Sequence, residues 1–144
     1  MDKTFQKFAS RLSQNPEQVL RYELGGSPLL YSTNDAAGKL LSSQATRTAT
    51  TAKIQLRASR DGPRLPPCEN CGAKRVFELQ LVPHAITMLE VDETGLDGMD
   101  WGTIIVGVCE RDCGDRGVEQ GVWGWVEEWV GVQWEEQSTP SRPA

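Results

Sequence analysis

Two pairs of cysteines, each beside an apolar segment, constrain the fold of this 144-residue chain more than any other feature. Cys68 and Cys71 precede the alternating stretch RVFELQLVP, whereas Cys109 and Cys113 follow the apolar run GTIIVGV. If the two segments pair as strands, the cysteine pairs meet at one end of a sheet. Four thiolates are the ligand set that structural zinc favours. We therefore predict a four-cysteine zinc cross-brace that ties the two central strands together.

Two other interpretations of the cysteines stay open at this point. Cys109 could be a buried thiol on an apolar strand, with the other three cysteines incidental. Cys68 and Cys71 could instead form a redox pair, but such a pair is expected at a helix N-terminus, and here a strand follows. Disulfides are not expected, because four cysteines are few for a disulfide scaffold of this length.

The spacing of apolar residues predicts an α+β fold, mainly an antiparallel β-sheet with short helices. An amphipathic helix is expected over residues 4–14, and Asn15 with Pro16 favours a second short helical turn. Two short strands, LRYEL and PLLYS, flank a glycine turn at residues 25–27, and a short helix is expected over residues 83–93.

Two further strands are expected to carry the core. The stretch RVFELQLVP predicts a half-buried strand with Phe77, Leu79 and Leu81 on one face and Glu78 and Gln80 on the other. The run GTIIVGVCE (102–110) is apolar on both faces, which is typical of a central strand with both sides covered.

The C-terminal run VWGWVEEWVGVQWEE is rich in tryptophan and glutamate. If residues 122–134 are extended, one face carries Val122, Val126, Val130, Val132 and Trp134, and the other carries Trp123, Trp125, Glu127, Trp129 and Gln133. We interpret the valine face as core and the aromatic, acidic face as a partly covered surface.

The length of the chain indicates one domain with a single core. Residues 1–32 are expected to supply its N-terminal helix and hairpin, and residues 66–136 its cysteine-containing β core. Residues 33–65 are rich in Ser, Thr, Ala, Gln and Arg and predict a flexible insertion, although KIQLR (53–57) alternates like an edge strand. A disordered tail is expected over residues 137–144.

The opening stretch MDKTFQKFASRL lacks the apolar run of a signal peptide, and no later stretch is apolar for long enough to span a bilayer. We therefore expect a cytoplasmic location, extending to the nucleus, with reduced thiols and no membrane contact.

Charge is distributed unevenly along the chain. Residues 1–75 carry 12 Lys/Arg and 6 Asp/Glu, whereas residues 76–144 carry 3 Lys/Arg and 14 Asp/Glu. The net charges of the two parts are therefore +6 and −11. The acidic part would repel phosphates and attract basic partners.

The residues give little indication of catalysis. His84 is the only histidine and is expected at a helix start or on the surface. No Ser/His/Asp or Cys/His set stands in a recognisable motif, and no glycine-rich phosphate loop follows a strand. We expect a protein that is not an enzyme.

The chain contains, in this order, the segments FQKFASRLSQNPEQVLRYELGGSPLLYS, CENCGAKRVFELQLVPHAI, MDWGTIIVGVCERDC and VEEWVGVQWEE. Together they resemble the C-terminal domain of the programmed cell death protein 2 family, which includes the fungal 20S rRNA accumulation protein. The resemblance covers about residues 3–32 and 66–136.

This resemblance implies a role in ribosome biogenesis, as a dedicated chaperone that captures a new small-subunit ribosomal protein (the S-five type) for the 40S subunit. It also implies that the two cysteine pairs here correspond to the family's two pairs. Complete members usually carry another domain N-terminal to this one, which would be a further partner.

The leading hypothesis is therefore a monomeric, non-enzymatic protein-binding domain. Its acidic half offers carboxylates and aromatic faces to the Lys and Arg side chains of a basic ribosomal protein. The predicted partner-binding residues are Trp123, Trp125, Glu127, Glu128 and Trp129. The alternative interpretation of these tryptophans is a sheet-to-sheet core, or the interface with the N-terminal domain.

Two hypotheses from other classes compete with it. A zinc-ribbon-like RNA-binding module in pre-rRNA processing would use the tryptophans to stack bases, although the acidic C-terminal half makes RNA binding unexpected. A thiol oxidoreductase would use Cys68 and Cys71.

Overall fold

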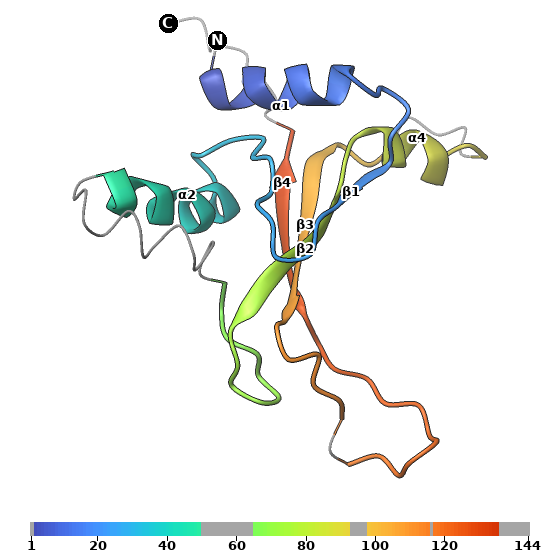
Figure 1. Cartoon of the computed structure of the whole chain (residues 1–144). Coiled ribbons are helices and arrows are strands. Elements are labelled where there is room, and N and C mark those ends of the chain that lie inside the picture. The colour runs from blue at the N-terminus through green and yellow to red at the C-terminus, as the bar shows by residue number, and fades with distance from the viewer. Residues whose placement is uncertain (1, 50–64, 93–97, 116, 136–144) are drawn as a thin grey trace, which may run out of the picture.

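A four-stranded antiparallel β-sheet forms the centre of the molecule, with the strands in the order β1-β2-β3-β4 (Figure 1). The structure is a computed structural model that describes residues 2–49, 65–92, 98–115 and 117–135. The elements are α1 (Lys3–Ser13), β1 (Leu20–Tyr22), α2 (Ala36–Ala49), β2 (Arg75–Leu81), α4 (His84–Leu89), β3 (Trp101–Cys109) and β4 (Trp129–Trp134). The predicted α+β class, mainly antiparallel sheet with short helices, is confirmed.

The helices surround the sheet unevenly. Helices α1 and α4 lie at one end of it, α2 lies beside it, and the connection from β3 to β4 extends away from the opposite end (Figure 1). In the described part of the chain, no helix has the length and apolar character that a membrane span requires.

Helix α1 confirms the amphipathic helix predicted at the N-terminus. Asp2 is its N-cap, because the Asp2 carboxylate accepts a hydrogen bond from the backbone N–H of Thr4 at 3.0 Å. The rings of Phe5 and Phe8 contact the ring of Tyr31 edge to face, with centroids 5.1 and 5.4 Å apart. This aromatic cluster holds the helix against the rest of the molecule.

Two local predictions near α1 are wrong. Instead of a second helical turn, residues from Asn15 to Gln18 form a simple turn in which the Gln18 N–H donates to the Asn15 carbonyl at 3.2 Å. Of the two short strands predicted around the glycine turn, the first is β1, but PLLYS (28–32) forms no strand.

The segment 28–32 instead crosses one face of the sheet, where two buried glutamines hold its backbone. Gln80 accepts from the Leu29 N–H at 2.7 Å and donates to the Leu29 carbonyl at 3.0 Å. Gln133 accepts from the Tyr31 N–H at 2.7 Å and donates to the Ser32 carbonyl at 2.6 Å. These contacts replace strand pairing. We call the face of the sheet that segment 28–32 covers the crossed face.

The position of Gln80 corrects the face assignment of β2. The ladder between β2 and β3 shifts register between Phe77 and Leu79, so Glu78 is an extra, bulged residue. After a bulge the alternation moves by one residue, and Gln80 therefore shares the buried face of Phe77. Leu79 and Leu81, predicted as core, point to the opposite face and are only half-buried.

The predicted inner and outer faces of the C-terminal strand are also reversed. The strand expected over residues 122–134 forms only as β4, and its buried residues are Gly131 and Gln133, whereas Val130 and Trp134 are exposed. The valine face is thus not the core, because Gln133 is needed on the inner side to bind the crossing segment.

Strand β3 is a central strand, as predicted, but only one of its faces is fully covered. The buried positions are Trp101, Gly102, Thr103, Ile105, Gly107 and Cys109, and the half-buried ones are Ile104, Val106 and Val108. The expectation that both faces are covered is therefore corrected.

The predicted flexible insertion over residues 33–65 begins with an ordered helix, α2. The carboxylate of Asp35 accepts from the Gly38 N–H at 2.7 Å, which caps the helix, and Ala37 and Leu41, one turn apart, are both buried. Residues 50–64, with the proposed edge strand KIQLR, lie outside the described residues, as does the predicted tail.

The main core lies on the crossed face. Its buried members are Leu41, Leu65, Phe77 and Ile105, with Leu30, Leu40 and Trp129 packed against them. A Cβ at Gly107 in β3 would overlap the end of the Leu65 side chain, so a larger residue there would require Leu65 to shift.

Candidate metal centre and the arm it anchors

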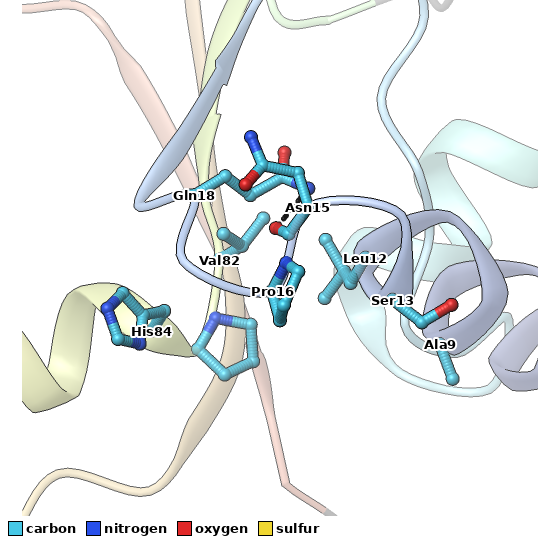
Figure 2. A pocket seen from close by; sticks show the side chains of 9 residues that line it. Ala9, Leu12, Ser13, Asn15, Pro16, Gln18, Val82 and His84 are labelled. Carbon is cyan, nitrogen blue, oxygen red and sulfur yellow. Dashed lines mark hydrogen bonds between the residues drawn. The ribbon is translucent and has the colours of Figure 1, made fainter.

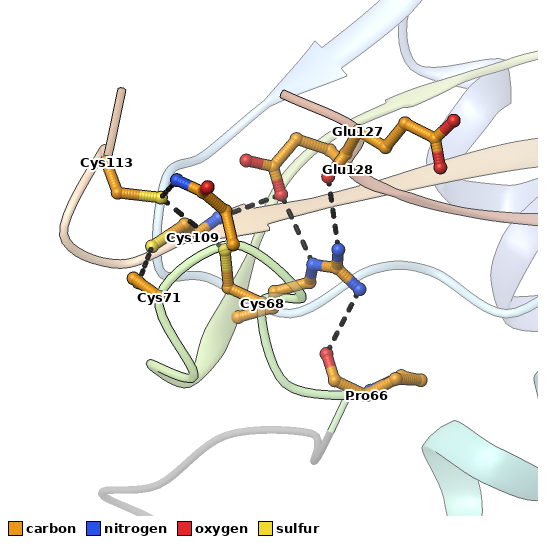
Figure 3. A network of polar contacts seen from close by, with 9 residues as sticks. Pro66, Cys68, Cys71, Cys109, Cys113, Glu127 and Glu128 are labelled. Carbon is orange, nitrogen blue, oxygen red and sulfur yellow. Dashed lines mark hydrogen bonds and ion pairs between the residues drawn. The ribbon is translucent and has the colours of Figure 1, made fainter. Parts of the chain in front are cut away.

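The four cysteines meet at the end of the sheet from which the β3–β4 connection leaves. All four Sγ atoms lie within 4.8 Å of one another. The Sγ atoms of Cys68 and Cys113 are 3.5 Å apart, as are those of Cys71 and Cys109, so each short contact joins one pair to the other (Figure 3). The register explains the meeting, because Arg75 at the start of β2 faces Cys109 at the end of β3.

These distances fit a metal ion and not a disulfide. The thiols are free, and a disulfide would need sulfur atoms about 2.05 Å apart. A tetrahedral ion with metal–sulfur bonds of about 2.3 Å holds its sulfur ligands about 3.8 Å apart. The cluster is therefore a candidate metal site, and the predicted cross-brace geometry is present.

Tight turns present both pairs of thiols. In the first turn the Gly72 N–H donates to the Cys68 carbonyl and the Cys68 N–H donates to the Ala73 carbonyl, both at 2.8 Å. Gly72 has φ +75°, a left-handed conformation that glycine adopts without strain. In the second turn Asp112 takes φ 49°, which a short polar side chain tolerates.

The surroundings of the sulfurs favour the thiolate form of Cys68 and Cys109 and oppose that of Cys113. The backbone N–H of Cys71 lowers the pKa of Cys68, and the backbone N–H of Cys113 lowers the pKa of Cys109 to about 7. At Cys113 the Asn70 side chain acts to lower the pKa, but the neighbouring Cys68 thiol and burial outweigh it and raise the pKa to about 12. Thiolates this close repel one another, so holding all four sulfurs as thiolates needs a cation among them.

A buried arginine links the cysteine cluster to the far end of the β3–β4 connection. The Nε of Arg75 lies 3.2 Å from Glu128 Oε2, and the same oxygen accepts from the Cys109 N–H at 3.1 Å (Figure 3). The Arg75 guanidinium also donates to the carbonyls of Pro66 and Glu127, at 3.3 and 3.1 Å. Asn70 adds a second link, since its Nδ2 donates to Cys113 Sγ at 3.2 Å and to the Gly114 carbonyl at 2.9 Å.

Sequence reasoning missed both Arg75 and Asn70. The signal for Arg75 was a cation at the start of an apolar strand, four residues after a cysteine and directly after Lys74. For Asn70, it was an amide between two cysteines. Neither signal is specific by itself.

We call residues 110–128, between β3 and β4, the arm. The side chains of Trp123 and Trp125 on it are 87% and 86% exposed. The arm contains six Asp/Glu and two Arg, and Glu127 is among its exposed residues. A surface of this kind offers aromatic faces and carboxylates to a cationic partner.

The five predicted partner-binding residues therefore fall into two groups. Trp123, Trp125 and Glu127 point into solvent from the arm. Trp129 packs against the core on the crossed face, and the Glu128 carboxylate is engaged by Arg75. Only the first group is open to a partner, and whether it binds one stays a prediction.

His84 begins helix α4, as predicted, beside a cavity of about 260 Å³ between α1 and the β2–α4 turn (Figure 2). The cavity is lined by Ala9, Leu12, Ser13, Asn15, Pro16, Gln18, Val82, Pro83 and His84. No carboxylate or thiol is among these residues.

The fold and the site define a small α+β domain in which a four-cysteine cluster closes one end of an antiparallel sheet. The chain belongs to the family of the C-terminal domain of programmed cell death protein 2, whose model matches residues 2–134. The sequence resemblance is thereby confirmed.

Several longer proteins are similar to the chain. It is 39% identical over 134 residues to Probable 20S rRNA accumulation protein 4 of Schizosaccharomyces pombe. The aligned region covers 93% of this chain and 29% of that protein. It is 34% identical to human Programmed cell death protein 2-like, over 78% of this chain and 24% of that protein. It is 32% identical to mouse Programmed cell death protein 2, over 85% of this chain and 29% of that protein. The chain thus spans well under a third of the length of these relatives, and no solved structure matches it.

Proposed function

We propose that this domain acts in ribosome biogenesis, as a non-enzymatic binding domain for a basic small-subunit ribosomal protein of the S-five type. One observation carries the proposal: two almost fully exposed tryptophans on an acidic arm, with both ends of the arm fixed. The name of the S. pombe relative, an rRNA accumulation protein, supports the process, and the client class comes from the resemblance to the family. The same proposal includes a cytoplasmic and nuclear location.

The chemistry of the arm suits a cationic client. An Arg or Lys side chain over the face of an exposed indole gains about 0.5–1 kcal/mol, and neighbouring carboxylates add charge attraction. Trp123 and Trp125 flank Gly124, and Glu127 follows two residues later. Because the carboxylates would repel phosphates, this composition favours a basic protein over RNA.

We further propose that zinc occupies the cysteine cluster and that its role is structural. The donor set fits, since two turns hold four cysteine sulfurs at suitable sulfur–sulfur distances. Bound zinc would supply the charge that keeps all four sulfurs deprotonated. Cys68 and Cys71 on one side, and Cys109 and Cys113 on the other, would then tie the root of the arm to β2.

Binding of the purified S-five type ribosomal protein to this chain tests the proposed function. The double variant Trp123→Ala/Trp125→Ala should weaken binding by about tenfold or more, as the loss of exposed aromatic anchors does. The matched control is Trp134→Ala, because Trp134 is also exposed but lies on β4 outside the arm. Binding should also weaken steeply with added salt.

Three results would overturn the proposed function. One is no binding of the ribosomal protein by the wild-type chain; another is equal weakening by the control and the double variant. The third is salt-sensitive binding of pre-rRNA that depends on Trp123 and Trp125, which would favour the RNA-binding hypothesis instead.

A further inference from the structure

The face of the sheet opposite the crossing segment is apolar across all four strands. Residues paired directly between strands point to the same face, so the register arranges them in rows. The rows are Leu20, Leu81, Ile104 and Val132; Tyr22, Leu79, Val106 and Val130; and Val76 with Val108. We call these ten residues the open face.

The open face is accessible in the described structure. Leu20, Tyr22 and Val130 are 42%, 59% and 55% exposed, and its other members are half-buried. Helix α2 packs through Leu41 on the crossed face, and α1 and α4 lie at one end of the sheet (Figure 1). Contiguous apolar surface of this kind marks an interaction site in soluble proteins.

The crossed face has the opposite chemistry. Its polar members Arg75, Gln80, Thr103 and Gln133 are all buried. The residues that the structure describes thus cover the face that carries the buried polar side chains and leave the mainly apolar one accessible. This arrangement is unfavourable for an isolated domain, so we expect the open face to be covered by another folded unit.

The low charge of the open face indicates which kind of unit covers it. None of its ten residues is charged, and the bulged Glu78, which lies among them in β2, accepts a hydrogen bond from the Tyr22 hydroxyl at 3.2 Å. Permanent interfaces are apolar in this way, whereas transient ones are as polar as the rest of the surface. A basic client that must be released fits the arm better than it fits this face.

The size of the open face argues against a second copy of the chain. Strands about 4.8 Å apart, with same-face residues about 6.8 Å apart, give each residue about 33 Å² and the whole face about 300 Å². Stable dimers bury about 800 Å² per partner, whereas interfaces between domains of one chain bury about 300–750 Å² on each side. A small interface suffices when a linker keeps the two domains close.

We propose that the open face docks a second domain of the same family polypeptide, drawn from the part that relatives carry outside the region matched here. That region makes up only 29% of the S. pombe protein, so most of its length is available to form the partner. The docking surface of the partner is apolar and uncharged. This interface is independent of client binding by the arm.

A chimera tests the proposal: this chain replaces the matched region of the S. pombe protein, and side-chain oxidation by hydroxyl radicals is compared between the chimera and the isolated chain. Tyr22 on the open face should become several-fold less reactive in the chimera, while Trp125 on the arm should not change. Val106→Lys at the centre of the face should restore the reactivity of Tyr22. Val91→Lys, at an exposed valine outside the face, should not.

Equal reactivity of Tyr22 in the chimera and the isolated chain would overturn the proposal. So would protection of Tyr22 that rises with the concentration of the isolated chain, which indicates a second copy, or that arises only when a basic ribosomal protein is added. Circular dichroism of both lysine variants distinguishes lost docking from lost folding. If Val106→Lys is unfolded, Leu20→Lys at the edge of the face replaces it, with the same expected result.

Discussion

The neighbouring residues Glu127 and Glu128 have the same chemistry and opposite surroundings, so removing the charge of each in turn gives a sharp test of the structure. Glu128 Oε2 contacts both Arg75 Nε and the Cys109 N–H, whereas Glu127 is exposed and its backbone carbonyl accepts from the Arg75 guanidinium. In Glu128→Gln an oxygen remains for the Cys109 N–H, but the buried Arg75 loses its counter-charge. In Glu127→Gln the backbone carbonyl that binds Arg75 stays in place, and the changed carboxylate is at the surface.

The size of the effect follows from the burial of the two partners. Breaking a fully buried ion pair costs about 3–5 kcal/mol, because the remaining charge stays buried and unpaired. The Arg75 side chain is 5% exposed and that of Glu128 is 26% exposed, so water compensates part of the loss. We expect Glu128→Gln to lower the free energy of unfolding by about 2 kcal/mol and the melting temperature by about 4–8 °C. Glu127→Gln should stay within about 0.5 kcal/mol of the wild type.

Urea unfolding followed by circular dichroism measures both variants. The double variant Arg75→Met/Glu128→Leu should be more stable than Glu128→Gln, because it removes both charges together. Equal stability of Glu127→Gln and Glu128→Gln would refute the assignment of the ion pair. A double variant less stable than either single charge loss would refute its energetic interpretation.

Three further predictions test other parts of the molecule. Chelation of bound metal should expose four reactive thiols per chain, measured by thiol titration before and after chelator, and a zinc content far below one ion per chain in reduced protein would contradict the metal site. Gln133→Leu should cost about 3 kcal/mol in urea unfolding, because the Tyr31 N–H and the Ser32 carbonyl lose their buried partner, whereas an unchanged stability would contradict the crossing segment. The hydrogen bond to Glu78 raises the pKa of Tyr22, so absorbance titration should place this phenol above its ordinary value, and Glu78→Gln should lower it again.

The parts of the fold that depend on local pattern could be predicted from sequence. The strand that delivers Cys109 and the turn that carries Cys68 and Cys71 are each encoded by a short run of residues, and antiparallel pairing is enough to bring them together. The N-terminal helix is likewise a matter of local spacing and an Asp2 cap.

The orientation of the sheet could not be predicted, because it depends on residues far apart in the chain. One bulged residue, Glu78, reverses the alternation of β2, and nothing in the stretch RVFELQLVP signals it. Gln80 and Gln133 are buried because they bind backbone groups 51 and 102 residues away, and no periodicity within one strand encodes such a partner. Alternation within one strand therefore assigns Gln80 and Gln133 to the solvent side, although an amide side chain is well suited to bind a crossing backbone.

The two faces of the sheet differ in role. The crossed face specifies the fold, and the open face is available for contact with another domain. A buried amide or guanidinium is stabilising only when its partners are in place, so the contacts of Gln80, Gln133 and Arg75 fix one path for the crossing segment and one register for the strands. Among the described residues, every buried side-chain nitrogen and oxygen has a hydrogen-bond partner. Apolar packing is less selective, and any complementary surface can cover the open face. The domain therefore determines its own structure through the crossed face, and the valines and leucines of the open face remain available to a second domain.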